Sequence, residues 1–141
     1  MGLKYLNSPQ RDLVRLPLAA STADIKVGDV ITDTGAATGF YQKVDGSGDA
    51  VKGVSLEVVK SPAANGGATV LVDVSPNTNY LASPDAGSVT TALRFKSMDI
   101  GADGASIDID ASATDDIYCI DVYTDENTLK VQIRPAFAGV A

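Results

Sequence analysis

The chain of 141 residues contains no histidine and no tryptophan, and its single cysteine is Cys119. Without histidine, the Ser-His-Asp and Cys-His forms of nucleophilic catalysis are excluded, and so are imidazole ligands to a metal. One cysteine can form neither an intrachain disulfide nor a multi-thiolate metal site. The sequence therefore predicts a protein that is not an enzyme and holds no cofactor, with Cys119 as a small buried apolar residue.

Long apolar runs are also missing, because no stretch approaches the roughly 20 residues that a membrane-spanning helix needs. The first residues, MGLKYLNSPQRDLVRLP, contain no continuous apolar segment of the kind found in a signal peptide. We therefore expect synthesis in the cytoplasm and no membrane partner.

Positive charge is scarce, since 11 basic residues stand against 18 acidic ones and give a net charge of −7. This balance argues against nucleic acid as the main partner. The charge is also uneven: residues 1–20 are mildly cationic, whereas residues 97–127 contain acids and no base.

Apolar residues recur with a period of two along most of the chain, and helical spacing is nearly absent. This pattern, with a bias toward valine, isoleucine and threonine, predicts a single all-β domain, a barrel or sandwich of about eight short strands. The expected strands are 25–32, 40–44, 50–59, 68–75, 89–96, 106–110, 117–123 and 129–134.

The first 20 residues do not follow this pattern, because Pro9 and Pro17 interrupt any regular element and the apolar residues share no period. We interpret residues 1–20 as an extended N-terminal arm on a β domain at 21–141, with a short helix over 10–16 as an alternative. Whether the arm lies on its own domain or on a partner is left open.

The tripeptide Asp33-Thr34-Gly35 is the string that holds the catalytic aspartate of aspartic proteases. A chain with one copy would have to dimerise to bring two such aspartates together. Thr32 precedes Asp33, where those enzymes need an apolar strand. We therefore expect a hairpin turn that Asp33 caps and in which Gly35 adopts a positive φ, and we keep the dimeric protease as a remote alternative.

The acidic segment 98–116 places Asp99, Asp103, Gly104 and Asp110 at positions one, five, six and twelve of a calcium loop. Gly101 stands at position three of this loop, where a ligand is needed, and no helical pattern flanks the segment. Because acids alternate with isoleucines at 106–110, we predict a solvated strand face and no metal site, with a loosely bound surface Ca²⁺ as the alternative.

Three stretches follow one another in a characteristic order: VGDVI at 27–31, VKGVSLE at 51–57 and ATVLVDV at 68–74. The chain ends in LKVQIRPAF at 129–137, a strand that leads into a short tail. Over residues 25–75 this order resembles small capsid decoration (cement) proteins of tailed bacteriophages. Ser55 stands where alanine is commoner in that family, and the segment 33–49 is longer.

The resemblance implies a structural virion protein, usually a homotrimer, that binds the major capsid protein on the outer surface of an assembled head. In this role the arm would add a strand to the shell, with Arg11 and Arg15 pairing with shell carboxylates. The expected capsid-binding residues are Leu3, Tyr5, Leu6, Arg11, Arg15 and Leu16. A tail or fibre domain that recognises a surface glycan is the second hypothesis, which the aromatic content of 6% disfavours.

Overall fold

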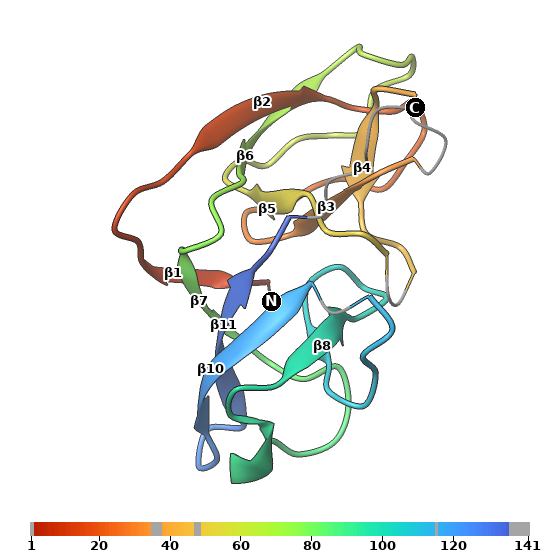
Figure 1. The fold of residues 1–141 in the computed structure, drawn as a ribbon. Helices are drawn as coiled ribbons and strands as arrows, with labels where there is room; N and C mark the ends of the chain where they lie inside the picture. The colour runs from red at the N-terminus through yellow and green to blue at the C-terminus, as the bar shows by residue number, and fades with distance from the viewer. Residues whose placement is uncertain (1, 35–37, 47–48, 115, 136–141) are drawn as a thin grey trace.

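The computed structural model describes residues 2–34, 38–46, 49–114 and 116–135, and within these ranges the protein is all-β (Figure 1). Helix in the described ranges is limited to one three-residue 3-10 turn, η1 (Thr91–Leu93). The strands are β1 (Lys4–Asn7), β2 (Leu13–Pro17), β3 (Val30–Asp33), β4 (Tyr41–Lys43), β5 (Gly53–Ser55), β6 (Thr69–Asp73), β7 (Asn79–Ala82), β8 (Ser97–Ile100), β9 (Ile107–Asp108), β10 (Ile117–Tyr123) and β11 (Thr128–Ile133).

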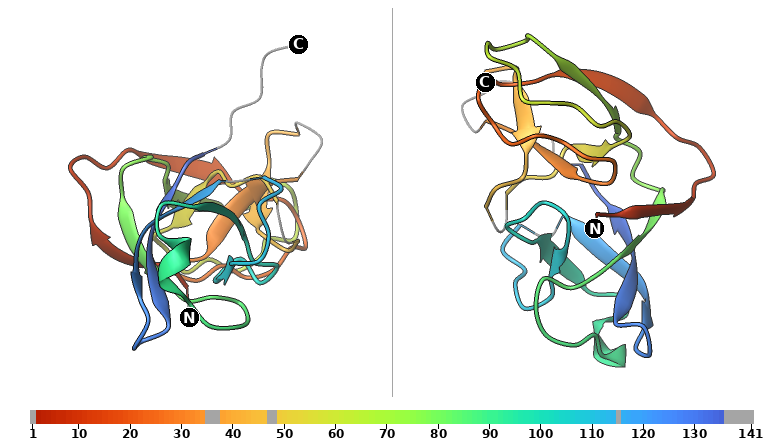
Figure 2. Two further views of the ribbon diagram at one scale, coloured as in Figure 1. Left: turned by 60° about the horizontal axis from the view of Figure 1, so that its bottom comes forward. Right: turned by 180° about the vertical axis from the view of Figure 1, so that it is seen from behind.

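These strands form two antiparallel sheets, a six-stranded one in the order β1-β7-β11-β10-β8-β9 and a five-stranded one in the order β2-β6-β5-β3-β4. The five-stranded sheet lies above the six-stranded sheet in Figure 1 and in the right-hand view of Figure 2. The arrangement is consistent with a β sandwich, so the predicted fold class is confirmed, with eleven described strands in place of about eight.

The main core lies between the two sheets, because successive residues of a strand point to opposite faces and both sheets turn an apolar face inward. Val30 and Val54 of the five-stranded sheet pack there with Tyr80, Ile117 and Leu129 of the six-stranded sheet. A smaller core covers the opposite face of the five-stranded sheet and contains Leu18, Ile25, Ile31, Val70 and Val72. Alternation along β3 thus supplies both cores, with Val30 in the main one and Ile31 in the smaller one.

Seven of the eight expected strand segments contain a strand. The segment 117–123 coincides with β10, and 129–134 overlaps β11. The expectation for 89–96 is wrong: this segment contains η1, after which Phe95 adopts a φ of 66° that no strand allows. Strands β7 and β8 were missed, since β7 has only four residues and β8 contains Asp99.

The arm is extended but is built into both sheets. Strand β1 pairs with β7, and β2 pairs with β6, so the helix considered over 10–16 is wrong. Pro17 is the last residue of β2, where a missing amide N–H is tolerated. Of the alternatives left open, the structure places the arm on its own domain.

Candidate functional site

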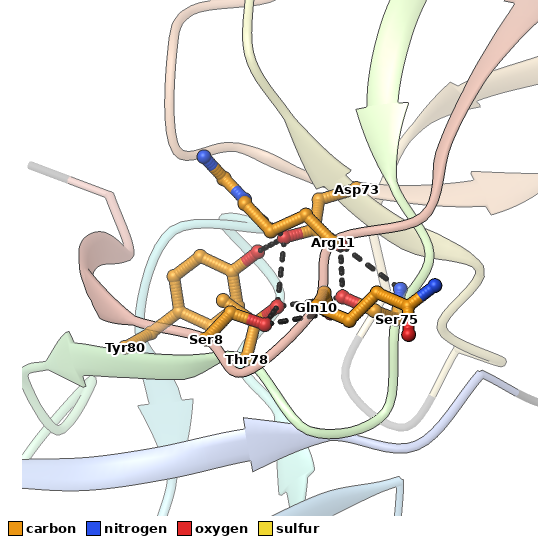
Figure 3. A network of polar contacts seen from close by, with 7 residues as sticks. All are labelled: Ser8, Gln10, Arg11, Asp73, Ser75, Thr78 and Tyr80. Atoms are coloured by element: carbon orange, nitrogen blue, oxygen red, sulfur yellow. Dashed lines mark hydrogen bonds and ion pairs between the residues drawn. The ribbon is translucent and has the colours of Figure 1, made fainter.

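The arm supplies an edge strand to each sheet, and this position defines the candidate site. Strands β1 and β2 are the first strands in the two sheet orders, so each has one edge without a strand partner among the described residues. Residues 8–12 connect β1 to β2 and so pass from the six-stranded sheet to the five-stranded one. Residues 74–78 join β6 to β7 in the same way. The two connections run side by side and meet at Asp73 (Figures 1 and 3).

Asp73 is a buried carboxylate that accepts hydrogen bonds from both connections. Its Oδ2 atom lies 2.9 Å from Nε of Arg11 and 2.8 Å from the hydroxyl of Tyr80, and both groups donate to it. Its Oδ1 atom accepts from the backbone N–H of Ser75 at 2.9 Å and from the Ser75 hydroxyl at 2.5 Å. A buried charge needs this number of donors, because it has lost its hydration.

Two further hydroxyl groups extend the network to the arm. Thr78 Oγ1 lies 2.6 Å from Ser75 Oγ and 2.9 Å from Oδ2 of Asp73. Ser8 donates to the carbonyl of Gln10 at 2.8 Å, and its Oγ lies 3.1 Å from Oγ1 of Thr78, whose single hydroxyl proton has Asp73, Ser75 and Ser8 within reach as acceptors. We call the group Ser8, Arg11, Asp73, Ser75, Thr78 and Tyr80 the Asp73 cluster.

The ionisation of the Asp73 cluster follows from these contacts. Burial by itself raises the pKa of Asp73, but the hydrogen bonds from Ser75, Tyr80 and Arg11 outweigh it and hold the pKa below its usual range. Burial and the adjacent Asp73 carboxylate raise the pKa of Tyr80. The cluster therefore holds a carboxylate, a guanidinium and a neutral phenol at neutral pH.

An aromatic stack joins the cluster to β1. The guanidinium carbon of Arg11 lies 3.9 Å from the centre of the Tyr5 ring, and the rings of Tyr5 and Tyr80 meet edge to face at 6.5 Å. Cation–π and edge-to-face contacts of this kind are attractive. Tyr5 thus holds Arg11 over the Asp73 carboxylate.

The expected capsid-binding residues divide into two groups. Leu3 is buried in the main core, and its N–H donates to the carbonyl of Gly28 at 2.9 Å. Arg11 is held by Asp73, and Arg15 makes a two-pronged pair with Glu57 at 2.8 and 3.2 Å. Leu16 packs against the smaller core. These four side chains are engaged within the chain, which leaves Tyr5 and Leu6 on the surface.

Four apolar side chains of the two edge strands are exposed. The exposed fractions are 41% for Tyr5, 37% for Leu6, 47% for Leu13 and 41% for Val14. We call these four residues the edge surface. Leu13 and Val14 are also apolar residues of the arm, but they were not among the expected capsid-binding residues.

Sequence reasoning also missed Asp73 and Tyr80. No local signal marked Asp73, because in the stretch TVLVDV it alternates with Val72 and Val74, a pattern that predicts a solvent-facing acid. The partner from the arm, Arg11, lies 62 residues away in the sequence and had no local signal.

Asp33 is the last residue of β3 and pairs with Tyr41 across the hairpin to β4. Its carboxylate lies 3.6 Å from Nζ of Lys52 and is about a third exposed. The expected hairpin after β3 is confirmed, although Gly35 lies outside the described residues. The geometry is that of a surface ion pair at a strand end.

The acidic segment is only partly a solvated face. Asp110 is exposed, but Asp99 is buried and accepts from the backbone N–H groups of Ala113 and Thr114 at 3.0 and 2.8 Å. Asp116 is buried and accepts from the N–H of Val51 at 2.8 Å. The expectation of solvation is therefore wrong for Asp99 and Asp116, because turns without regular hydrogen bonding need side-chain acceptors. Among the described residues, no group of three or more acids or cysteines is arranged to hold a metal ion.

Cys119 is buried on the inner face of β10, as predicted. Burial and the nearby Asp121 carboxylate raise the pKa of its thiol to about 11. The thiol is thus protonated and unreactive at neutral pH.

Comparison with family models, with curated proteins and with solved structures found no match to this chain. Within the described ranges, no helix is long and apolar enough to cross a membrane.

Proposed function

We propose that this protein is a structural virion component that binds the outer surface of an assembled phage head and stabilises the capsid lattice. The observation that carries the proposal is the edge surface. Two strands with an unpaired backbone edge present four exposed apolar side chains from one continuous segment. Exposed apolar edge strands are the usual sites of strand addition between proteins.

Attachment would proceed by pairing of a strand of the major capsid protein with β1 or β2, while Leu6, Leu13 and Val14 enter apolar grooves. The Asp73 cluster and the Arg15–Glu57 pair hold these strands in place before binding, so little conformational entropy is lost on contact. A homotrimer would bring three such edges to the lattice, and the linked contacts would reinforce one another. Binding to the assembled state alone stabilises that state by mass action.

Point substitutions test the proposal better than deletion of the arm. Deleting residues 1–18 would remove β1, β2 and the core residues Leu3 and Leu18, and so would disturb the fold. The variant Leu6→Lys with Leu13→Lys places charge on both edges and leaves the Asp73 cluster intact. A matched control is Val58→Lys, which changes an exposed apolar residue that belongs neither to the edge surface nor to the six-stranded sheet.

The measurement is co-sedimentation with empty heads of the phage that encodes the chain, with negative-stain imaging of the pellets. Wild type and Val58→Lys are expected to bind alike, and the edge variant is expected to bind at least about tenfold more weakly. If wild type does not sediment with heads, the decoration function is wrong. If the edge variant binds as wild type does, the attachment surface is elsewhere.

A further inference from the structure

The six-stranded sheet has a second face, which points away from the main core. On β11, Leu129, Val131 and Ile133 are buried, so Lys130, Gln132 and the following Arg134 point outward. On β10 the pairing places Tyr118, opposite Gln132, and Asp121, opposite Lys130, outward, and Ile120 lies at a bulge between Cys119 and Asp121. Through their pairing partners, Lys4, Asn7, Asn79 and Leu81 belong to the same surface. We call this surface the outer face.

A ladder of side chains makes the outer face rigid. Asn79 donates to Asn7 at 2.7 Å, and Gln132 donates to Asn79 at 3.1 Å, which links β1, β7 and β11. Arg134 donates to Gln132 at 3.3 Å, and its guanidinium lies 4.8 Å from the centre of the Tyr118 ring. This row of side chains therefore crosses β1, β7, β11 and β10, and its charged end, Arg134, lies beside the exposed ring of Tyr118.

The positive charges of the chain gather on the outer face. Five of the 11 basic residues form ion pairs with acids in the described part of the chain. Of the other six, Lys4, Lys130 and Arg134 lie on the outer face and Lys96 lies at its border, whereas Lys26 and Lys60 lie elsewhere. The acids on this side of the sheet include Asp121, which lies opposite Lys130 and is paired with Arg94 at 3.0 Å, and Asp108 of β9. Asp125 and Glu126 lie in the turn between β10 and β11. A chain of net charge −7 thus carries a local cationic surface.

Phe95 stands at the border of the outer face, in a backbone conformation that is unfavourable for a bulky side chain. It is 80% exposed and has a φ of 66°, a region that bulky side chains seldom occupy. Two backbone hydrogen bonds hold it against β10, from Phe95 to the carbonyl of Cys119 and from Cys119 to the carbonyl of Lys96, both at 2.9 Å. Strain of this kind is typical of residues with a role beyond packing.

A groove of about 290 Å³ lies beside Phe95 and is lined by Lys96, Ser97, Tyr118, Cys119 and Ile120. It combines an amine and a hydroxyl with two exposed rings and an aliphatic side chain. An apolar side chain of a partner fits against the rings, while a carboxylate fits the amine of Lys96.

We propose that the outer face binds an acidic segment of a partner protein, with one apolar side chain of that segment in the groove beside Phe95. Carboxylates on the segment meet Lys96, Lys130 and Arg134. The net negative charge of the body does not prevent this contact, because charges more than about 8 Å apart are largely screened at physiological ionic strength. A nucleic acid is a poorer match, because its phosphates make no favourable contact with the apolar side of the groove. The inference is independent of the attachment through the edge surface.

The test is fluorescence anisotropy at physiological ionic strength with a labelled peptide of glutamates interrupted by two leucines. Its controls are the same peptide with lysine for glutamate and a peptide of glutamate alone. Two variants remove the two halves of the site: Phe95→Asn, since asparagine tolerates a positive φ, and Lys96→Glu with Lys130→Glu. Val58→Lys, at an exposed apolar residue outside both the outer face and the edge surface, is the matched control.

We expect the mixed peptide to bind wild type and Val58→Lys alike, and to bind each outer-face variant at least about tenfold more weakly. Phe95→Asn should melt no lower than wild type, which separates a binding role from a structural one. Equal binding of the mixed peptide to wild type and to both outer-face variants would overturn the proposal. So would tighter binding of glutamate alone, of heparin or of single-stranded DNA, each of which would indicate a general polyanion surface. Self-association of wild type that Lys96→Glu with Lys130→Glu abolishes would instead assign the face to a second copy of the chain and would also overturn it.

Discussion

The Nε atom of Arg11 lies 2.9 Å from Oδ2 of Asp73, and this ion pair joins the N-terminal arm to the point where the chain passes from one sheet to the other. The carboxylate is fully buried, whereas the guanidinium is about a quarter exposed and covered on one side by Tyr5. Because the same oxygen also accepts from Tyr80, one buried charge holds β1, β2 and β7 in register.

Asp73→Asn should strongly destabilise the protein. The substitution keeps the shape but removes the charge that Arg11 faces, and the new amide N–H₂ competes with donors on every side. Loss of one partner of a buried ion pair costs about 3–5 kcal/mol, so we expect the free energy of unfolding to fall by that amount. Tyr80→Phe removes one donor and should cost about 1.5–3 kcal/mol. Urea denaturation followed by circular dichroism measures both, and an Asp73→Asn protein as stable as wild type would show that the cluster has no net structural role.

The stability of the protein should fall on acidification through protonation of Asp73. The pKa of Asp73 is lowered in the folded state, so above its unfolded pKa of about 3.9 the carboxylate contributes its full stabilisation. Below that pH the unfolded state takes up the proton first, and the stabilisation is lost as the pH falls through the folded pKa. Urea midpoints from about pH 7 to about pH 3 should therefore drop more steeply for wild type than for Asp73→Asn. Burial and Asp108 raise the pKa of Asp85, so protonation of Asp85 favours the folded state as the pH falls. This contribution is the same in both proteins and cancels from the comparison. Parallel curves would contradict this assignment.

Gly28→Ala should displace the start of the arm. Gly28 has a φ of +90°, and a Cβ atom there would lie 2.6 Å from the carbonyl oxygen of Leu3, to whose N–H Gly28 is hydrogen-bonded. Gly87 is the matched control, with a φ of +78° and its nearest neighbour atom at 3.9 Å. We expect Gly87→Ala to cost about 1–2 kcal/mol from the left-handed backbone alone. Gly28→Ala should cost more than about 3 kcal/mol, because the clash is with backbone that cannot move freely. Equal melting temperatures for the two variants would show that the arm can shift at no cost.

Cys119 should resist thiol reagents. Its pKa of about 11 leaves almost no thiolate at mildly alkaline pH, and the side chain is buried. With dithionitrobenzoate, the folded protein is expected to react at least about a hundredfold more slowly than the same protein in urea. A fast reaction of the folded protein would mean that β10 opens readily from the core.

The sequence predicts the strands whose burial alternates strictly. β11 follows that rule over all six residues, and β10 follows it up to a bulge between Cys119 and Asp121, with its bounds predicted without error. β8 was missed because Asp99 interrupts its apolar pattern, and the turn that Asp99 caps, at residues 113 and 114, lies too far along the chain to be recognised. Phe95 was placed in a strand because Val89 and Leu93 alternate with it, and nothing local signals its positive φ.

The candidate site was predictable in part. The apolar character of the arm is visible in the sequence, and Tyr5 and Leu6 are exposed as a binding role requires. The burial of Leu3 and the ion pair of Arg11 with Asp73 depend on pairings between residues more than 60 positions apart. No local sequence pattern encodes such pairings. The outer face was missed for the same reason, since its charges come from four separate segments.

The pairing of β1 and β2 with strands far along the chain has a consequence for synthesis. Residues 4–17 leave the ribosome well before residues 69–82, with which they pair. At about 5–20 residues per second, the two strands wait for roughly 3 to 15 s without their partners. During that interval Leu3 and Leu18, both core residues, are in water together with the edge surface. The nascent chain is therefore most prone to aggregate before residue 82 has emerged, and a chaperone that binds short extended apolar segments would act on this stretch first.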